Sequence, residues 1–496
     1  MRIPLNRQSQ QPMYLQIQER LQSLIHSGSL PPGEKLPSIR GLAKTLQVNK
    51  LTVIEAYDRL VAEGLISARQ GSGYFVDAAP IPDPARPCCF APHQTVVVWE
   101  AQANRPFALY ARSIQAKQQP DLIDLSCAFP KHPPDDLARI IRKVSTDSDN
   151  FFDYNAIEGH TRLRHQIANL LLQVGLESSA DDIMVVNGAM QGLSLAIRHF
   201  VQPGDWVVVE SPTFFSALPI FQQLGCRIIG IPMDREGMNL ELLARYLDSH
   251  RPRLIFTTST LHNPTGITTT ATHRRQLLAL ASQYECPILE DNAYEVLHFG
   301  SPPPPLKVMD TEGWVTYVGT FSKTLSPGLR VGYLVVPPAH RQALLEQRYL
   351  TDIHTPTLSQ AVVSEFLAQG HYRRHLQRVH TQLHHNRNLM LRGLEQSFPE
   401  FARWTVPEGG MYLWVQLPDR YGPLMPRLIQ QAEAHGILIL SGSSFFPDGL
   451  GYPAMRLSYA NVAPELIEGA MSRLGSLVKD LDRSDSPLPQ AVSGAL

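Results

Sequence analysis

Short apolar runs alternate with amphipathic helical patterns over residues 119–480, and this alternation constrains the fold more than any other feature of the chain. Each run ends in a polar or glycine-bearing turn, as in IMVVNG, DWVVVE, RLIFTTS, CPILED and WVTYVG. Alternating strand and helix patterns are typical of βαβ units, in which helices cross over between parallel strands. The sequence therefore predicts an α/β domain with a mainly parallel central sheet.

Composition divides the chain of 496 residues into four segments. A chain of this length is too long for one ordinary core, so two or three domains are expected. Residues 1–78 are dense in short helical patterns and end in a glycine-rich hairpin. Residues 79–118 are rich in proline without periodicity, which is typical of a semi-rigid linker. Residues 119–480 form the α/β domain, and residues 481–496 are expected to be a disordered tail.

Charge and cysteine content indicate a cytoplasmic protein. The formal net charge is −1, but residues 1–78 carry nine lysines and arginines against six acidic residues, so a modest positive excess lies at the N-terminus. Five cysteines without a CxxC pair fit a reducing compartment better than a disulfide framework. No apolar run approaches membrane-spanning length. We expect no metal site, and the adjacent Cys88 and Cys89 leave a redox role open.

Residues 1–78 carry the pattern of a helix-turn-helix. Apolar residues at helical spacing run from Tyr14 to Ile25, Ser38 is placed to cap a second short helix, and Asn49 to cap a third. Two short helices joined by a tight turn at Gln47 are typical of DNA-binding proteins. Residues 65–76 predict a hairpin that would form a wing. A small helical protein-interaction module with solvated charges is the alternative.

The stretch LPSIRGLAKTLQVNKLTVIEAYDRLVAEGLISARQGSGYFV resembles the winged-helix domain of GntR-type bacterial regulators almost position for position. The resemblance covers residues 12–76 and implies binding to double-stranded DNA. The residues expected to contact DNA are Ser38, Arg40, Lys50, Thr52, Arg69 and Gly71. Lys50 stands where the family usually has arginine, which would replace a bidentate guanine contact by a point-charge contact.

A lysine, a hydroxyl and an arginine lie close together in VGTFSKTLSPGLRVGY, residues 318–333. Lys323 follows an apolar run, and desolvation at a strand end would make its amine nucleophilic toward an aldehyde. Ser322 and Arg330 could together hold a phosphate dianion. An aldehyde and a phosphate describe pyridoxal 5′-phosphate (PLP), with Lys323 as the Schiff-base lysine. A solvated surface lysine is the alternative.

Other residues at strand ends supply what a PLP site needs. Asp291 could keep the pyridine nitrogen protonated, and the helix that opens after Asn187 could offer amides to the phosphate. Phe214 could cover the ring, while Asn263 and Tyr294 could hydrogen-bond its phenolic oxygen. Each residue also has an ordinary interpretation as a helix cap, a turn or a core aromatic. Their shared position at the carboxyl ends of strands favours a ligand site.

Over residues 120–475 the chain resembles the fold type I PLP-dependent aminotransferases. The motifs that carry the resemblance are YNAIEGHTRLR, NGAMQG, ESPTF, HNPTG, EDNAY, SKTLSPGLRVGY, PEGGMYLWV and MRLSYA. The resemblance implies a smaller C-terminal α/β subdomain and Lys323 as the aldimine lysine. Tyr154 would reach the phosphate of a neighbouring subunit, which implies a homodimer. Arg456 would bind a substrate or effector carboxylate, with a structural ion pair as the alternative. The residues that the resemblance assigns to the phosphate are Gly188, Ala189, Met190, Ser322 and Arg330.

Two positions depart from the aminotransferase pattern. Phe214 stands where the family usually has tyrosine, which keeps the stacking surface but removes a hydroxyl. Ala128 stands where glycine is usual, which crowds the backbone near the expected carboxylate site.

The combination of a winged helix, a linker and an aminotransferase-like domain resembles the MocR-type regulators of the GntR family. It implies a homodimeric, DNA-binding transcriptional regulator that binds PLP as an aldimine, senses PLP or an amino acid, and reads an operator with paired half-sites. Two alternatives stay open: an active PLP-dependent aminotransferase that also binds DNA, and a DNA-binding dimer with a cofactor-free scaffold domain. The effector, the promoter, and the choice between activation and repression are not given by the sequence.

Overall fold

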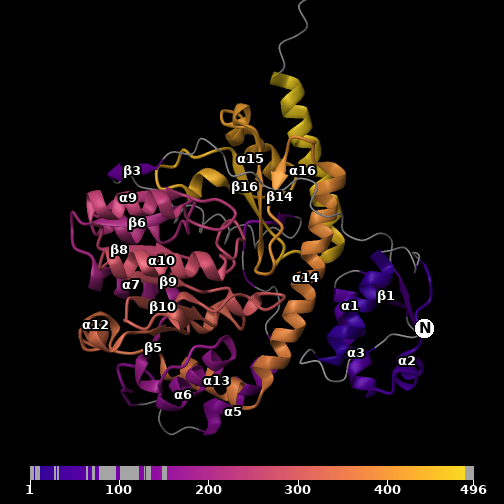
Figure 1. The fold of residues 1–496 in the computed structure, drawn as a ribbon, viewed down its shortest axis with the longest axis horizontal. Helices are drawn as coiled ribbons and strands as arrows, with labels where there is room; N and C mark the ends of the chain where they lie inside the picture. Colours follow the sequence, from indigo (N-terminus) through magenta and orange to yellow (C-terminus); the bar gives the residue numbers. More distant parts are fainter. Residues whose placement is uncertain are drawn as a thin grey trace, which may run out of the picture.

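The computed structural model describes residues 5, 12–26, 30, 33–62, 65–69, 73–76, 96–100, 122–127, 129, 134, 136–147 and 153–485. Three helices and a two-stranded hairpin form the N-terminal unit, drawn in indigo in Figure 1. The helices are α1 (Met13–His26), α2 (Ile39–Leu46) and α3 (Lys50–Ala62). The antiparallel strands are β1 (Ile66–Arg69) and β2 (Gly73–Val76). The expected helix-turn-helix and wing are therefore present.

Short polar side chains set the boundaries of α2 and α3. The Ser38 hydroxyl accepts a hydrogen bond of 3.1 Å from the Gly41 amide, and the Asn49 side chain accepts one of 3.0 Å from the Leu51 amide. Gln47 ends α2 in the left-handed conformation with φ 52°. These caps satisfy backbone groups that a helix end leaves unpaired. The buried Tyr57 hydroxyl donates to the Pro37 carbonyl oxygen at 2.8 Å and ties α3 to the segment before α2.

An eight-stranded mixed sheet forms the centre of the large domain, in the order β3-β7-β6-β8-β9-β10-β11-β5. The strands β7, β6, β8, β9 and β10 run parallel, whereas β3 is antiparallel to β7, and β11 is antiparallel to both β10 and β5. The predicted mainly parallel sheet is confirmed. The strands are β3 (Val97–Glu100), β5 (Ile183–Val186), β6 (Trp206–Ser211), β7 (Arg227–Pro232), β8 (Leu254–Thr257), β9 (Ile288–Asp291), β10 (Val315–Thr320) and β11 (Gly332–Val335).

Helices cover both faces of this sheet, which explains why its strands are apolar throughout. Alternate strand residues enter different cores: Val207 and Val209 pack with α7, α8 and α12, while Val208 packs with α9, α10 and α11. A third core joins β5 to α5, α6 and α13. The helices are α5 (Leu137–Asp147), α6 (Thr161–Leu171), α7 (Ala189–Phe200), α8 (Leu218–Gln223), α9 (Leu240–His250), α10 (Ala271–Gln283), α11 (Leu306–Met309), α12 (Pro338–Asp352) and α13 (Thr357–Ala368).

A smaller C-terminal subdomain follows, as expected. Its four-stranded antiparallel sheet has the order β12-β13-β16-β15, and the long helix α14 packs against α16. Figure 1 shows α14 running between the large domain and the N-terminal unit, where it contacts α3. The elements are β4 (Ile123–Asp124), α14 (His371–Ser397), β12 (Arg403–Trp404), β13 (Tyr412–Gln416), α15 (Met425–Ala434), β14 (Ile437–Leu438), β15 (Leu440–Ser441), β16 (Ala454–Ser458) and α16 (Pro464–Asp485).

Two segments differ from the sequence-based expectation. Residues 97–100, inside the expected linker, form β3 and pair with β7 at the edge of the sheet. A disordered tail was expected from residue 481, but α16 continues to Asp485. Leu481 is 1% exposed and continues the apolar face that begins at Ile467, so burial extends the helix. Within the described residues, no helix combines the length and the hydropathy that a membrane crossing requires.

Candidate functional site

Strand order brings several of the predicted cofactor residues to one edge of the large sheet. β8, β9 and β10 are parallel, and β5 runs in the same direction because two antiparallel steps, through β11, separate it from β10. In register, Thr320 pairs with Gly332, and Gly332 pairs with Val186. The segments that follow β5 and β10 and the one that precedes β11 therefore meet. Ligands bind at such carboxyl edges in α/β proteins.

The turn after β5 and the segment before β11 form a cradle for an anion. Gly188 caps α7 with φ 75° and ψ 164°, a backbone conformation that is essentially confined to glycine. A β-carbon on Gly188 would overlap the Arg330 guanidinium, which donates from Nη2 to the Asn187 carbonyl oxygen at 3.1 Å. Ala189 opens the helix beside it, and Met190 is 37% exposed. The site thus combines a helix N-terminus with a guanidinium, which suits a phosphate.

The Ser322 hydroxyl, in the turn that follows β10, is a further sign that this edge of the sheet takes a ligand. Ser322 is 8% exposed, and its Oγ is buried without a hydrogen-bond partner among the residues that the structure describes. A buried hydroxyl without a partner is costly, whereas a phosphate oxygen would satisfy it. The residues present therefore fit the phosphate group of PLP.

Asp352 holds Asn187, the residue before Gly188, in position. Its carboxylate accepts a short hydrogen bond from the Asn187 side-chain amide. The other carboxylate oxygen lies 2.6 Å from Nε of Arg348, a fully buried side chain that also donates to the Val185 carbonyl oxygen at 2.7 Å. Because Asp352 ends α12, distant in sequence from Asn187, residue patterns gave no signal for this contact.

Lys323 lies in the turn after β10, with Nζ 5.7 Å from the centre of the Tyr294 ring. Burial lowers the pKa of Lys323 to about 8, and the nearby Arg456 charge acts in the same direction. Burial raises the pKa of Asp291, at the end of β9, to about 6, while a hydrogen bond from the Ala293 amide and the charge of Lys323 oppose that rise. A lysine with a lowered pKa is more often neutral near pH 7, as a nucleophilic amine requires.

A second buried carboxylate and a histidine lie near Asp291. Nε2 of His262 is 3.2 Å from the Glu210 carboxylate, which also accepts a hydrogen bond of 2.5 Å from the Thr257 hydroxyl. Both Glu210 and His262 influence the pKa of Asp291, in opposite directions. Neither residue was predicted. The only available signal was their position in the words ESPTF and HNPTG.

Arg456 is 3% exposed and is held in place by hydrogen bonds and by two aromatic rings. Nη1 donates to Oδ1 of Asn263 at 2.8 Å, and Nη2 donates to the Ser126 carbonyl oxygen at 2.6 Å. Its guanidinium lies 4.0 Å from the centre of the Tyr412 ring and 5.0 Å from that of Phe445. Since Asn263 accepts through its oxygen, its amide nitrogen is the donor left for a ligand.

Tyr294 was expected to bind the ring oxygen of PLP, and its hydroxyl lies 2.5 Å from that of Tyr412. Tyr412 was not predicted as a site residue. Cys127 was also missed, although it lies near enough to Lys323 to influence the pKa of that amine. Tyr412 lies within the motif PEGGMYLWV, whereas Cys127 lies in no quoted motif, and the contacts of both residues span distant parts of the chain.

Phe214 and Tyr154 are two further residues that the sequence predicts to contact PLP. Phe214 is half-buried, with its ring 5.8 Å from that of Phe215. Tyr154 is 84% exposed, and its ring lies 6.0 Å from that of His354. Stacking by Phe214 and a contact from Tyr154 to a second subunit stay predictions. Among the described residues, no group of three or more histidines, cysteines and acidic residues is placed to hold a metal ion.

Among the described residues, the predicted DNA contacts lie on α2, α3 and β1 or cap α2. Arg40 on α2 and Lys50 at the start of α3 are exposed, and Thr52 is partly buried. Ser38 is exposed and also caps α2. Arg69 is the last residue of β1, whereas Gly71 lies outside the described residues.

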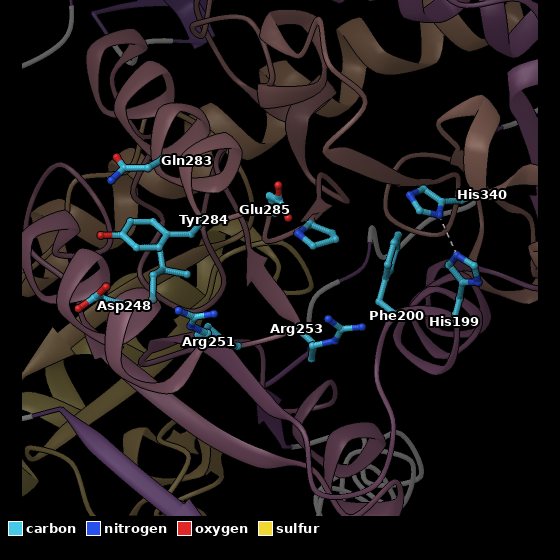
Figure 2. Close-up of a pocket in the computed structure, with 12 residues that line it drawn as sticks. His199, Phe200, Asp248, Arg251, Arg253, Gln283, Tyr284, Glu285 and His340 are labelled. Carbon is cyan, nitrogen blue, oxygen red and sulfur yellow. Dashed lines mark hydrogen bonds between the residues drawn. The ribbon is translucent and has the colours of Figure 1, made fainter.

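A surface hollow of 720 Å³ lies at the other end of the sheet, before the strands β8 and β9 begin (Figure 2). Arg251 and Arg253 line it, but so do the carboxylates of Asp248 and Glu285, and these charges balance. This hollow contains none of the predicted site residues.

Comparison with known proteins places the large domain in a defined class. Residues 120–474 match the family model described as aminotransferase class I and II. A crystal structure of Pyrococcus horikoshii kynurenine aminotransferase, in complex with PMP and substrates, superposes with a TM-score of 0.70 and 32% identity. The superposition covers 77% of this chain and 96% of the chain of that enzyme. The large domain therefore has the fold type I aminotransferase fold.

The N-terminal unit completes the identification. Residues 13–76 match the model of bacterial regulatory proteins of the gntR family. The HTH-type transcriptional regulator YdfD of Bacillus subtilis is 33% identical over 95% of this chain and 97% of its own length. The probable rhizopine catabolism regulatory protein MocR of Rhizobium meliloti is 28% identical over 99% and 98%, respectively. The chain belongs to the MocR-type transcriptional regulators, in which a GntR DNA-binding domain is fused to an aminotransferase class I and II domain.

Proposed function

We propose that this regulator binds PLP covalently through Lys323, senses PLP or an amino acid at the same site, and acts as a homodimer on DNA with paired half-sites. The observation that carries the proposal is the buried Ser322 hydroxyl without a described partner, in the turn after β10, at the same sheet edge as the cradle formed by Arg330 and the N-terminus of α7. A phosphate bound at this edge would satisfy the hydroxyl and would be attracted by the guanidinium and the helix amides.

The remaining contacts of PLP would come from residues at the same sheet edge. Bound PLP supplies an aldehyde that joins to an amine and a ring that withdraws electrons. Asp291 would face the ring nitrogen, and the Asn263 amide with the Tyr294 hydroxyl would donate to the ring oxygen. Phe214 would cover one face of the ring. The pKa of Lys323, lowered to about 8 mainly by burial, supports its role as the attached amine.

Arg456 would bind the carboxylate of an amino-acid effector. Two of its nitrogens are already oriented by Asn263 and Ser126, and its Nε has no hydrogen-bond partner among the described residues. A buried guanidinium pairs well with a carboxylate because it offers several donors in fixed geometry. An α-amino acid would place its amine toward Lys323 and its carboxylate toward Arg456.

A second copy of the chain would complete the cradle. Tyr154 is 84% exposed and touches His354, close to Asp352, which holds Asn187. Tyr349 and Leu350, at the end of α12, are 57% and 83% exposed. Large apolar groups clustered on a surface favour a protein interface. Homodimer formation would present two winged helices to DNA, and a symmetric pair reads paired half-sites.

An active aminotransferase that also binds DNA is the second candidate, because Lys323, Asp291 and Arg456 are all present. One experiment separates the candidates. Purified protein is titrated with PLP and then with single amino acids while its visible absorption is recorded. A band that Lys323→Ala abolishes and Lys143→Ala keeps supports PLP attachment, since Lys143 is a surface residue paired with Glu365. Sustained keto-acid production would favour the enzyme, and no band would refute cofactor binding.

A further inference from the structure

Tyr412 lies between Tyr294, at the ring-oxygen end of the proposed site, and Arg456, at its carboxylate end. It is the first residue of β13, is 3% exposed, and places its hydroxyl 2.5 Å from that of Tyr294, which is 4% exposed. The centre of the Tyr412 ring is 4.0 Å from the Arg456 guanidinium. β13 and β16 are paired, with Trp414 opposite Arg456, so the position of Tyr412 over the arginine is fixed by the sheet.

The two hydroxyls have a defined order of donation once a ligand is bound. Either oxygen can be the donor in the pair as it stands. Each tyrosine has one hydroxyl proton, so a Tyr294 that donates to the ring oxygen of PLP must accept from Tyr412. Burial raises the pKa of both tyrosines, so both keep their protons near neutral pH. A chain of two donors would then point at the ring oxygen.

Hydrogen bonds in a buried chain polarise one another, so the first donor strengthens the second. Arg456 lies against the face of the Tyr412 ring, and its charge opposes the rise of the tyrosine pKa that burial causes. The other charged or titratable groups that influence this pair are Asp291 and Cys127, and Lys323 lies over the Tyr294 ring. A carboxylate bound to Arg456 would offset the arginine charge that acts on Tyr412.

We propose that Tyr412 is a positioning residue that links the carboxylate end of the site to the ring-oxygen end. Its hydroxyl donates to Tyr294, Tyr294 donates to the ring oxygen of the cofactor, and carboxylate binding at Arg456 changes the strength of this chain through the Tyr412 ring. The inference rests on the proposed function, and it explains how one site registers that an amino acid has replaced the lysine.

The test is a pH titration of the visible band of the PLP-loaded, full-length protein. A hydrogen bond to the ring oxygen favours the deprotonated form, in which that oxygen carries more negative charge. Tyr412→Phe removes the first donor and keeps the ring over Arg456. The titration midpoint is expected to rise by about 0.5 to 1 pH unit, which corresponds to the net free energy of one neutral hydrogen bond. Tyr421→Phe is the matched control, because Tyr421 is a buried tyrosine of the same core that donates to the Val478 carbonyl oxygen.

A double-mutant cycle shows whether Tyr412 acts through Tyr294. In a Tyr294→Phe background, Tyr412→Phe is expected to cause no further shift, whereas full additivity of the two shifts would overturn the inference. Saturating succinate, an unreactive carboxylate probe, is expected to move the midpoint of the wild-type protein more than that of Tyr412→Phe. Equal movement in the two proteins would overturn the link to Arg456.

A shape-preserving variant covers the case in which Tyr412→Phe does not fold. Replacing Tyr412 by 3-fluorotyrosine makes the hydroxyl a stronger donor, so the midpoint is expected to fall. An unchanged midpoint overturns the inference while leaving PLP binding intact. Absence of the visible band from the wild-type protein would instead refute the proposed function and, with it, this inference.

Discussion

Arg330 donates a hydrogen bond of 3.1 Å from Nη2 to the backbone carbonyl oxygen of Asn187, across the ends of the neighbouring strands β11 and β5. This contact brings a guanidinium against Gly188, the residue that caps α7. The space for an anion is therefore bounded by a charged side chain on one side and helix amides on the other.

Gly188→Ala is expected to weaken PLP binding by about tenfold or more, because the added methyl would overlap Arg330 and the backbone conformation disfavours any side chain. The measurement is the dissociation constant from the visible absorption. Gly204→Ala is the matched control, since Gly204 has φ 88° but nothing within 4 Å of an added β-carbon. Equal affinities of the two variants would contradict the assignment of Gly188 to the phosphate.

The rate of PLP attachment is expected to depend on the protonation of Lys323. Because burial lowers the pKa of this amine to about 8, the neutral, reactive form increases as the pH rises toward 8 and then levels off. An unperturbed lysine would keep gaining reactivity up to its ordinary pKa of 10.5. Stopped-flow absorption from pH 6 to 10 checks the profile. Asp291→Asn should move the plateau to lower pH, since the Asp291 charge favours the protonated amine.

Much of the local structure could be predicted because its causes are local. Ser38 and Asn49 hold the starts of α2 and α3 through contacts within three residues, and apolar runs mark the strands of a sheet that is covered on both faces. β3 was not predicted, because a four-residue edge strand in a proline-rich segment depends on pairing with β7.

The parts of the site that were missed depend on contacts between distant residues. The hydroxyls of Tyr294 and Tyr412 meet across 118 positions, and Arg456 reaches the Ser126 carbonyl oxygen across 330. No spacing rule links such residues, because the fold of the C-terminal subdomain brings them together. The roles of Lys323 and Asp291 could be expected from their positions at strand ends, whereas that of Tyr154 could be expected only from the resemblance to a known family.

Arg40→Ala is expected to weaken DNA binding and to reduce the salt dependence of the affinity by about one phosphate contact. Arg40 is exposed in the first turn of α2, next to the helix-capping Ser38. Arg59→Ala is the control, because the Arg59 guanidinium already pairs with Glu55 at 3.0 Å and stacks on Tyr14. Fluorescence anisotropy at several salt concentrations measures both quantities. A wild-type slope in Arg40→Ala would exclude a phosphate contact.

Leu350→Glu is expected to raise the dimer dissociation constant by more than about tenfold, because an interface would bury the new carboxylate without a partner. Leu350 is 83% exposed at the end of α12, four positions before His354, whose ring lies 6.0 Å from that of Tyr154. Leu450→Glu is the control, since Leu450 is 75% exposed in the C-terminal subdomain. Sedimentation velocity measures the assembly. Dimers of equal stability in both variants would place the interface elsewhere.

Arg456→Ala is expected to lower the affinity for amino acids by about 10- to 100-fold, the range for losing charge-assisted hydrogen bonds to a carboxylate. PLP attachment at Lys323 should persist, because none of the residues expected at the phosphate contacts Arg456. The control is Arg420→Ala, which removes an exposed arginine paired with Asp482 at 2.9 Å. Amino-acid titrations followed by visible absorption measure the effect, with simple amines as a second ligand series. Because simple amines lack the carboxylate, their affinity should be the same for the wild-type protein and for Arg456→Ala. An equal loss of affinity for amines and amino acids would show that the arginine only maintains the fold of the site.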